Sequence, residues 1–213
     1  MNKTKNGVVV TKEFTANYIK FGTGKKTLIM IPGVGDGLKT VKGLALPFYM
    51  LYKDFCKDYT VYSFSRRNHI PKDFSIEEMA EDLYKCMTHF KIEKADVIGV
   101  SQGGMIGASL SVYHKEIVNK LVLVVTTPKP TKELKKSVNG WIEMAEEKDY
   151  KNIMLDTAVR SYTGKYTRVG KNIYGILSYI SKPKSFDRFI TLLKACLNFN
   201  ITRKLKYIES DTF

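Results

Sequence analysis

Cysteine is scarce in this 213-residue chain, which has only Cys56, Cys86 and Cys196. No two of them have C-x-x-C spacing, and their number is odd. Such a set argues against a disulfide framework and against a cysteine-based metal site. We therefore expect reduced, buried thiols and neither a metal ion nor another cofactor.

Long apolar runs are also missing. No segment approaches the ~18 apolar residues that a membrane span requires. Residues 1–13 have a basic start but an apolar run of only three residues, which is not the pattern of a signal peptide. These absences predict a cytoplasmic protein that does not associate with a membrane, and the 44% hydrophobic content suffices for a sizeable core.

Acidic residues are few: the chain has 21 Asp and Glu against 35 Lys and Arg, a net charge of +14. Such an excess can indicate nucleic-acid binding. However, the lysines are scattered, the densest clusters at 129–136 and 203–206 are short and interrupted, and no nucleic-acid motif is present. We interpret the charge as a solvated surface and expect no nucleic-acid partner.

A G-x-S-x-G motif at 99–103 is the most informative feature that is present. An apolar strand is predicted at 96–100, and small residues at 103–108 favour a closely packed helix start. Glycines on both sides of Ser101 allow the backbone to approach closely at a strained turn, as a nucleophile elbow requires. We therefore prefer Ser101 as a catalytic nucleophile over a glycine-rich turn without chemistry.

A second glycine-rich segment, 32–37, follows a predicted buried strand at 27–31. Acyl transfer needs two N–H donors for the oxyanion, one from the residue after the nucleophile and one from the loop after an earlier strand. This assigns the N–H groups of Gln102 and Val34, with Gly33 and Gly35 beside the substrate. A phosphate-binding loop is disfavoured because no Lys-Ser/Thr follows the glycines and G-x-G-x-x-G spacing is absent.

The order of these elements across residues 7–127 resembles the core of the α/β-hydrolase superfamily. The resemblance implies an α/β fold with a mostly parallel, doubly wound sheet: a core at 1–128, a helical lid at 129–198 and a lead-in to the remaining core at 199–213. Two positions depart from the family. Pro32 replaces a common histidine, and 64–69 lacks the Asp and Gly of a D-x-R-G-x-G segment.

The triad acid and base that the family supplies after the serine have no counterpart here. The only later histidine, His114, lies about thirteen residues along a helix from Ser101, or ~20 Å. His69 is the only loop histidine that could approach, and we prefer it as a surface residue. We therefore expect a chain shortened by roughly 55 to 70 residues that lacks the last strands. The strand at 121–125 would then be an exposed edge through which copies could self-associate.

Four helical segments are predicted between 131 and 197, and the resemblance makes them a lid over the active site. Their large side chains are candidates for an acyl pocket, although packing within the lid is the preferred role for each one taken singly. These candidates are Trp141, Met144, Tyr162, Tyr166, Tyr174 and Phe186.

These features together predict a serine hydrolase, similar to carboxylesterases, that acts on small-molecule esters and is inactive or impaired in this form. Two alternatives stay open. A relative that hydrolyses C–C bonds or acts as a cofactor-free peroxidase would use the same triad with a different pocket. A non-catalytic member would bind a small apolar ligand without turnover.

Overall fold

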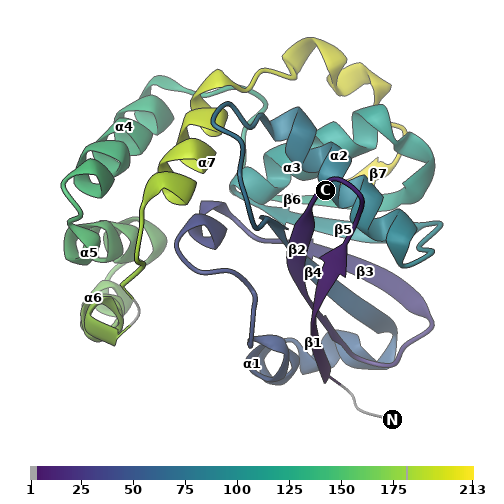
Figure 1. Ribbon diagram of the computed structural model, residues 1–213, viewed down its shortest axis with the longest axis horizontal. Helices are drawn as coiled ribbons and strands as arrows, with labels where there is room; N and C mark the ends of the chain where they lie inside the picture. The colour runs from purple at the N-terminus through teal and green to yellow at the C-terminus, as the bar shows by residue number, and fades with distance from the viewer. Residues whose placement is uncertain (1–3, 181) are drawn as a thin grey trace.

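A mixed seven-stranded sheet with the order β1-β2-β4-β3-β5-β6-β7 forms the centre of the protein (Figure 1). The computed structural model describes residues 4–180 and 182–213. β1 and β2 are antiparallel to their neighbours, and every pair from β4 to β7 is parallel. The predicted mostly parallel α/β fold is confirmed. The strands are β1 Thr4–Val10, β2 Thr15–Phe21, β3 Lys26–Ile31, β4 Tyr59–Arg67, β5 Ala95–Val100, β6 Val118–Val124 and β7 Asp211–Thr212.

Helices cover both faces of this sheet. α2 and α3 lie on one face, α1 lies on the other, and α4–α7 form a separate group beside the sheet (Figure 1). The α-helices are α1 Ala45–Leu51, α2 Ile76–His89, α3 Gln102–Tyr113, α4 Lys132–Glu146, α5 Tyr150–Ser161, α6 Lys165–Ile180 and α7 Asp187–Asn198. Short 3₁₀ helices are η1 Val34–Gly37, η2 Lys53–Lys57, η3 Lys115–Ile117 and η4 Thr202–Tyr207.

Local sequence signals explain the boundaries of two helices. Serine followed three residues later by glutamate, as at Ser75 and Glu78, predicts a capping box at a helix start. The Ser75 hydroxyl accepts the backbone N–H of Glu78, and the Glu78 carboxylate accepts the N–H of Ser75, so this capping box starts α2. The sequence of residues 39–55 predicts a single helix, and this prediction is wrong, because α1 is only seven residues long. Gly43, with φ of +84°, has a left-handed backbone that a regular helix cannot include.

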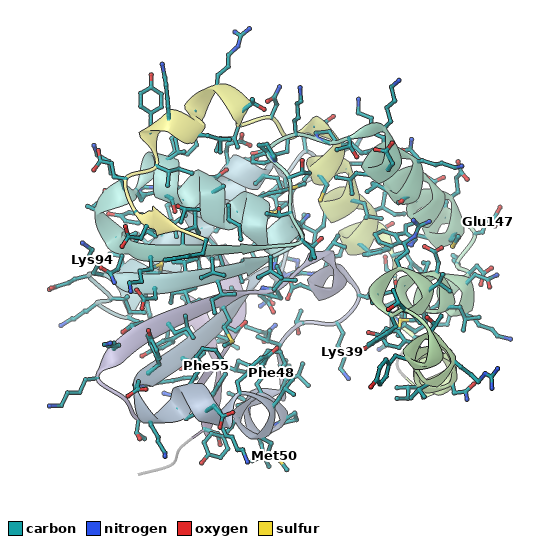
Figure 2. All side chains as sticks on the ribbon, turned by 180° about the vertical axis from the view of Figure 1, so that it is seen from behind. Lys39, Phe48, Met50, Phe55, Lys94 and Glu147 are labelled. Carbon is teal, nitrogen blue, oxygen red and sulfur yellow. The ribbon has the colours of Figure 1, made fainter. Side chains whose placement is uncertain are left out.

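The apolar core is divided between the two faces of the sheet. The α1 face holds Phe48, whose ring packs on Phe21 with centroids 6.3 Å apart, whereas Met50 of the same helix is 68% exposed (Figure 2). Helices α4, α5 and α7 share a further cluster that includes Val138 and Phe189. Whether 129–198 acts as a lid stays a prediction.

β7 corrects the expectation of a bare edge at β6. Thr212 pairs with Leu121, and the N–H of Phe213 donates to the Leu121 carbonyl oxygen at 2.9 Å. The lead-in segment therefore covers part of β6, and self-association through the outer edge of β7 stays a prediction. Within the described residues, no helix has both the length and the apolar character needed to cross a membrane. Residues 1–3 lie outside the described residues. They belong to segment 1–13, for which the sequence predicts no signal peptide.

Candidate functional site

Ser101 lies at the sharp turn between β5 and α3, with φ of +53° and ψ of −119°. A residue with a side chain rarely adopts such a backbone, which is strained and persists only where its surroundings hold it. Here the Ser101 N–H donates to the Val124 carbonyl oxygen at 2.8 Å, and the Ser101 carbonyl oxygen accepts the Thr126 hydroxyl at 2.8 Å. Hydrogen bonds to the end of β6 and the loop after it therefore hold the serine at the carboxyl edge of the sheet.

The glycines around Ser101 are required by close backbone contacts. A Cβ atom on Gly99 would lie 2.4 Å from the Gly103 carbonyl oxygen, and one on Gly103 would lie 2.2 Å from the Ile31 carbonyl oxygen. Gly104 is equally restricted, because its Cβ would meet the Thr126 side chain at 2.6 Å. The motif therefore lets α3 begin directly against β3 and the loop that follows it.

That loop brings a second set of backbone donors to the serine. A Cβ on Gly33 would be 3.5 Å from the Ser101 Cβ, so the two residues are neighbours. Among the described residues, no acceptor pairs with the N–H of Val34 or of Gln102, each the first residue of its helix. Gly35 lies farther along η1, with open space around its Cβ position.

Ser101, Gln102 and Val34 all line one pocket of about 220 Å³. The two unpaired N–H groups can donate to an oxygen atom bound beside the serine hydroxyl. The remaining wall is apolar or carries neutral hydroxyl groups. It consists of Met105, Val125, Thr126, Thr127, Thr131, Leu134, Val138, Trp141, Leu193 and Cys196.

Of the six large side chains considered for an acyl pocket, Trp141 of α4 lines this one. Its indole N–H donates to Asp156 of α5 at 2.6 Å, which fixes the ring. Met144 instead packs in the apolar cluster of α4, α5 and α7, beside the buried Phe186. Tyr162, Tyr166 and Tyr174 are also outside the lining.

No histidine or carboxylate among the described residues lines the pocket. His69 is exposed in the loop after β4, and His89 packs against Phe90. His114 stacks on Tyr84 and lies 2.8 Å from the Glu81 carboxylate, on the α2 and α3 side of the sheet. The described residues also contain no group of three or more His, Cys, Asp and Glu side chains suited to a metal ion.

Cys196 is a further pocket residue that the sequence did not single out for chemistry. Burial raises the pKa of its thiol to about 11, although the hydrogen bond from Gln102 opposes the shift. The thiol is therefore neutral near pH 7 and a weak nucleophile. Gln102 Nε2 donates to its sulfur at 3.2 Å and to the Leu192 carbonyl oxygen at 2.6 Å.

Two arginines behind the pocket were not predicted as functional. Arg66, at the end of β4, is 5% exposed, and its Nη2 donates to the Pro32 carbonyl oxygen at 2.7 Å and to Gln102 Oε1 at 2.9 Å. Arg188 of α7 donates to Asp36 Oδ2 at 2.7 Å and to the carbonyl oxygens of Asp36, Arg66 and Arg67. Segment 64–69, which departs from the family pattern, thus contributes a buried cation.

Comparisons with known proteins agree with this geometry. A family model described as the alpha/beta hydrolase fold matches residues 26–180. A putative carbamate hydrolase RutD from Caulobacter segnis is 27% identical over 92 residues, which cover 43% of this chain and 31% of the relative. The corresponding protein of Cronobacter sakazakii is 23% identical over 128 residues, covering 57% and 40%. The matched segment thus spans well under half the length of these relatives.

Solved structures match over nearly the whole chain. The enol-lactonase from Burkholderia xenovorans LB400 superposes with a TM-score of 0.75 at 16% identity, covering 97% of this chain and 79% of that one. An esterase from Exiguobacterium antarcticum gives a TM-score of 0.73 at 16% identity, covering 98% and 79%. At such identities the likeness concerns the fold.

Proposed function

The chain belongs to the α/β-hydrolase family, and on that premise we propose that it carries the nucleophile and the acyl-binding part of a serine-esterase site for small, uncharged esters. The observation that carries this proposal is the strained Ser101 turn beside two unpaired N–H groups in one pocket. Ser101 Oγ attacks the ester carbonyl carbon and loses its proton to solvent water, while the π bond of the carbonyl group breaks and its electron pair moves to the oxygen. The Val34 and Gln102 N–H groups stabilise the oxyanion that forms, and the alcohol leaves when this intermediate collapses to the acyl-serine.

The pocket supports the proposed substrate class. Its wall of apolar side chains and threonine hydroxyls offers no charged partner for an ionised substrate. A volume of about 220 Å³ suits a short acyl chain. Matched proteins named as a carbamate hydrolase, an enol-lactonase and an esterase also favour a carbonyl substrate. The free, buried cysteines are consistent with a cytoplasmic location.

Turnover by these 213 residues is slow in this proposal, because no general base lines the pocket. A serine hydroxyl without a base is a weak nucleophile, and removal of a triad base costs about 10⁴ to 10⁶ in kcat. Hydrolysis of p-nitrophenyl acetate and butyrate should therefore barely exceed the uncatalysed rate. Rapid hydrolysis that Ser101→Ala abolishes would instead reveal a base in this chain, with His69 the first to mutate.

Binding of butylboronic acid tests the site without requiring turnover. The Ser101 Oγ atom forms a bond to boron and releases its proton to water. The boron atom becomes tetrahedral and so resembles the tetrahedral intermediate of ester hydrolysis. Trp141 is the only tryptophan and lines the pocket, so its fluorescence reports occupancy. We expect saturable binding that Ser101→Ala weakens strongly, whereas Ser109→Ala, a buried serine of α3 outside the pocket, should not change it.

A non-catalytic binding protein is the second candidate, and the missing acid and base groups favour it. In that case 1-hexanol, which has no electrophilic atom, would bind as tightly as butylboronic acid, and Ser101→Ala would change neither affinity. A relative that cleaves C–C bonds or acts as a peroxidase would differ in the side chains that line the pocket. Assays of C–C hydrolysis and of peroxidation, on a protein that has the complete triad, would distinguish these activities from ester hydrolysis.

A further inference from the structure

The Arg66 guanidinium connects the two segments that carry the unpaired N–H groups. A single nitrogen, Nη2, donates to the carbonyl oxygen of Pro32 and to the side-chain oxygen of Gln102. Pro32 lies two residues before Val34, a pocket residue whose N–H has no acceptor among the described residues, and Gln102 carries the other unpaired N–H itself. The distance between the two donor segments is therefore restricted by one shared hydrogen-bond donor.

Burial makes this connection rigid. Among the described residues, Arg66 is the only buried arginine. Two of its nitrogen atoms, Nε and Nη1, have no hydrogen-bond partner within that part of the chain. Burial lowers the pKa of the guanidinium, and the nearby Asp36 carboxylate opposes that shift. Arginine side chains in proteins carry their charge at neutral pH. A desolvated cation with so few partners is costly, which calls for a role other than stability.

The Gln102 side chain is fixed at both of its ends. Its oxygen accepts from Arg66, while its Nε2 donates to the Leu192 carbonyl oxygen of α7 at 2.6 Å. Because the side chain and the N–H of Gln102 are attached to the same Cα atom, fixing the side chain at both ends restricts the position of that N–H. The interaction therefore acts on the same peptide group that is proposed to hold the oxyanion.

We propose that Arg66 is a positioning residue, which sets the separation and direction of the Val34 and Gln102 N–H groups and so makes them complementary to a tetrahedral adduct on Ser101. This inference rests on the proposed function for its catalytic meaning. The geometric part, that Arg66 holds the two amides in place, can be tested by itself.

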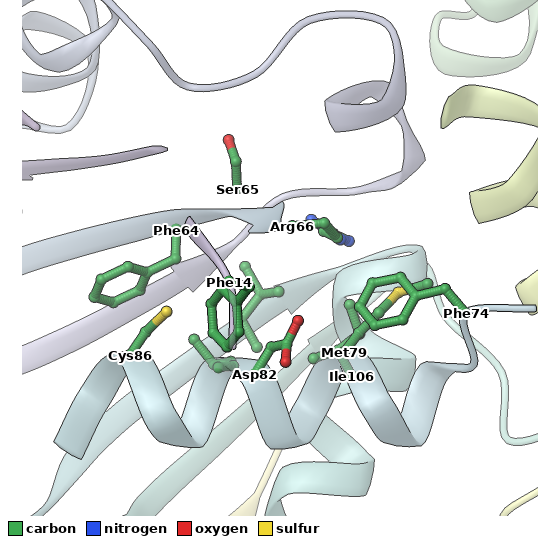
Figure 3. A pocket seen from close by; sticks show the side chains of 11 residues that line it. Phe14, Phe64, Ser65, Arg66, Phe74, Met79, Asp82, Cys86 and Ile106 are labelled. Atoms are coloured by element: carbon green, nitrogen blue, oxygen red, sulfur yellow. The ribbon is translucent and has the colours of Figure 1, made fainter. Parts of the chain in front are cut away.

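Arg67 offers a matched control. It is the next residue of β4, but its side chain points toward α2, where Nε donates to Asp82 Oδ2 at 2.6 Å and the guanidinium lies over the Phe14 and Phe74 rings. Figure 3 shows the Arg66 side chain extending sideways from the end of β4, while Asp82 lies below it on α2. Both arginines are thus largely buried residues of one strand, but Arg67 pairs with a carboxylate, whereas the Arg66 guanidinium donates to Pro32 and Gln102.

The experiment compares Arg66→Met, Arg66→Lys and Arg67→Met. Fluorescence of Trp141 gives affinities for butylboronic acid and for 1-hexanol, and ¹⁵N NMR gives the amide resonances of Val34 and Gln102. We expect Arg66→Met to weaken boronic acid binding at least about tenfold, to leave 1-hexanol within about twofold and to move both resonances. Arg66→Lys should keep part of the affinity, because an ammonium group can donate to one of the two oxygens.

Arg67→Met should lower the melting temperature while leaving both resonances and the ratio of the two affinities unchanged. Equal effects of Arg66→Met and Arg67→Met on that ratio and on the resonances would overturn the inference. If Arg66→Met does not fold, Arg66→Lys decides by the same measurements. If the unmodified chain shows no Ser101-dependent binding of boronic acid, the proposed function fails, and the amide resonances still decide whether Arg66 holds the two segments.

Discussion

Gln102 and Leu192 are joined by a 2.6 Å hydrogen bond from the Gln102 side-chain nitrogen to the Leu192 carbonyl oxygen. This bond connects the first residue of α3 to the middle of α7, 90 positions later in the chain. Arg188, one helical turn earlier on α7, binds the Asp36 carboxylate in η1. Helix α7 is therefore attached to both segments that carry the proposed oxyanion donors, Val34 and Gln102.

Removing the Arg188 side chain should strongly destabilise the fold. The Asp36 carboxylate is completely buried, so Arg188→Ala leaves a buried charge without its cationic partner, at a cost of about 3 to 5 kcal/mol. Urea unfolding measures this loss. Arg160→Ala is the control, since Arg160 pairs with Asp156 at an exposed site and should cost about 1 kcal/mol or less. Similar losses in the two variants would contradict the assignment.

Ser101→Gly should stabilise the protein, although it removes the proposed nucleophile. The backbone φ of +53° is unfavourable for serine and accessible to glycine, so we expect a gain of about 1 kcal/mol in the free energy of unfolding. Ser109→Gly, within α3, should instead lose at least about 0.5 to 1 kcal/mol. If thermal unfolding shows that Ser101→Gly lowers stability, the Ser101 side chain contributes more free energy than the backbone strain costs.

Alanine at two glycines should have effects of opposite sign. Gly103→Ala places a Cβ 2.2 Å from the Ile31 carbonyl oxygen and should destabilise by more than about 2 kcal/mol or prevent folding. Gly140→Ala, in α4 with open space around the Cβ position, should stabilise by about 0.5 to 1 kcal/mol. Melting temperatures of both variants provide the measurement, and a tolerated Gly103→Ala would refute the close approach of α3 to β3.

Alkaline pH should destabilise the protein through its buried thiols. Burial raises the pKa of Cys86 to about 12 and that of Cys196 to about 11, from an ordinary value of 9.0. Above pH 9 the unfolded chain ionises first, so this stability is complete below pH 9 and is lost as pH rises toward 11 and 12. Each thiol should cost about 1.4 kcal/mol at pH 10 relative to pH 7.

Urea unfolding at pH 7 and pH 10 in the presence of reductant tests this effect. Cys86→Ala should show a smaller difference between the two pH values than the unmodified chain, because one of the two thiols is gone. An identical difference would assign the alkaline loss to lysines and tyrosines instead.

Features set by neighbours in the sequence could be predicted. The Ser101 turn, the Ser75 capping box and the alternation of strands and helices all depend on residues a few positions apart. The role of Arg66 could not, because its partners Pro32 and Gln102 lie 34 and 36 positions away. A pair of arginines before an asparagine gives no indication that one of them is buried behind a pocket.

Asp36 is synthesised 152 residues before its partner Arg188, so the ion pair between them forms late during synthesis on the ribosome. Strands β1–β6 leave the exit tunnel early enough to pair with one another before α7 exists, since a chain folds as its segments emerge. Throughout this interval the Asp36 carboxylate lacks the Arg188 guanidinium. A nascent chain ending before residue 188 can therefore have a nearly complete sheet while the Asp36 carboxylate has the Arg66 backbone N–H as a partner but lacks the Arg188 guanidinium.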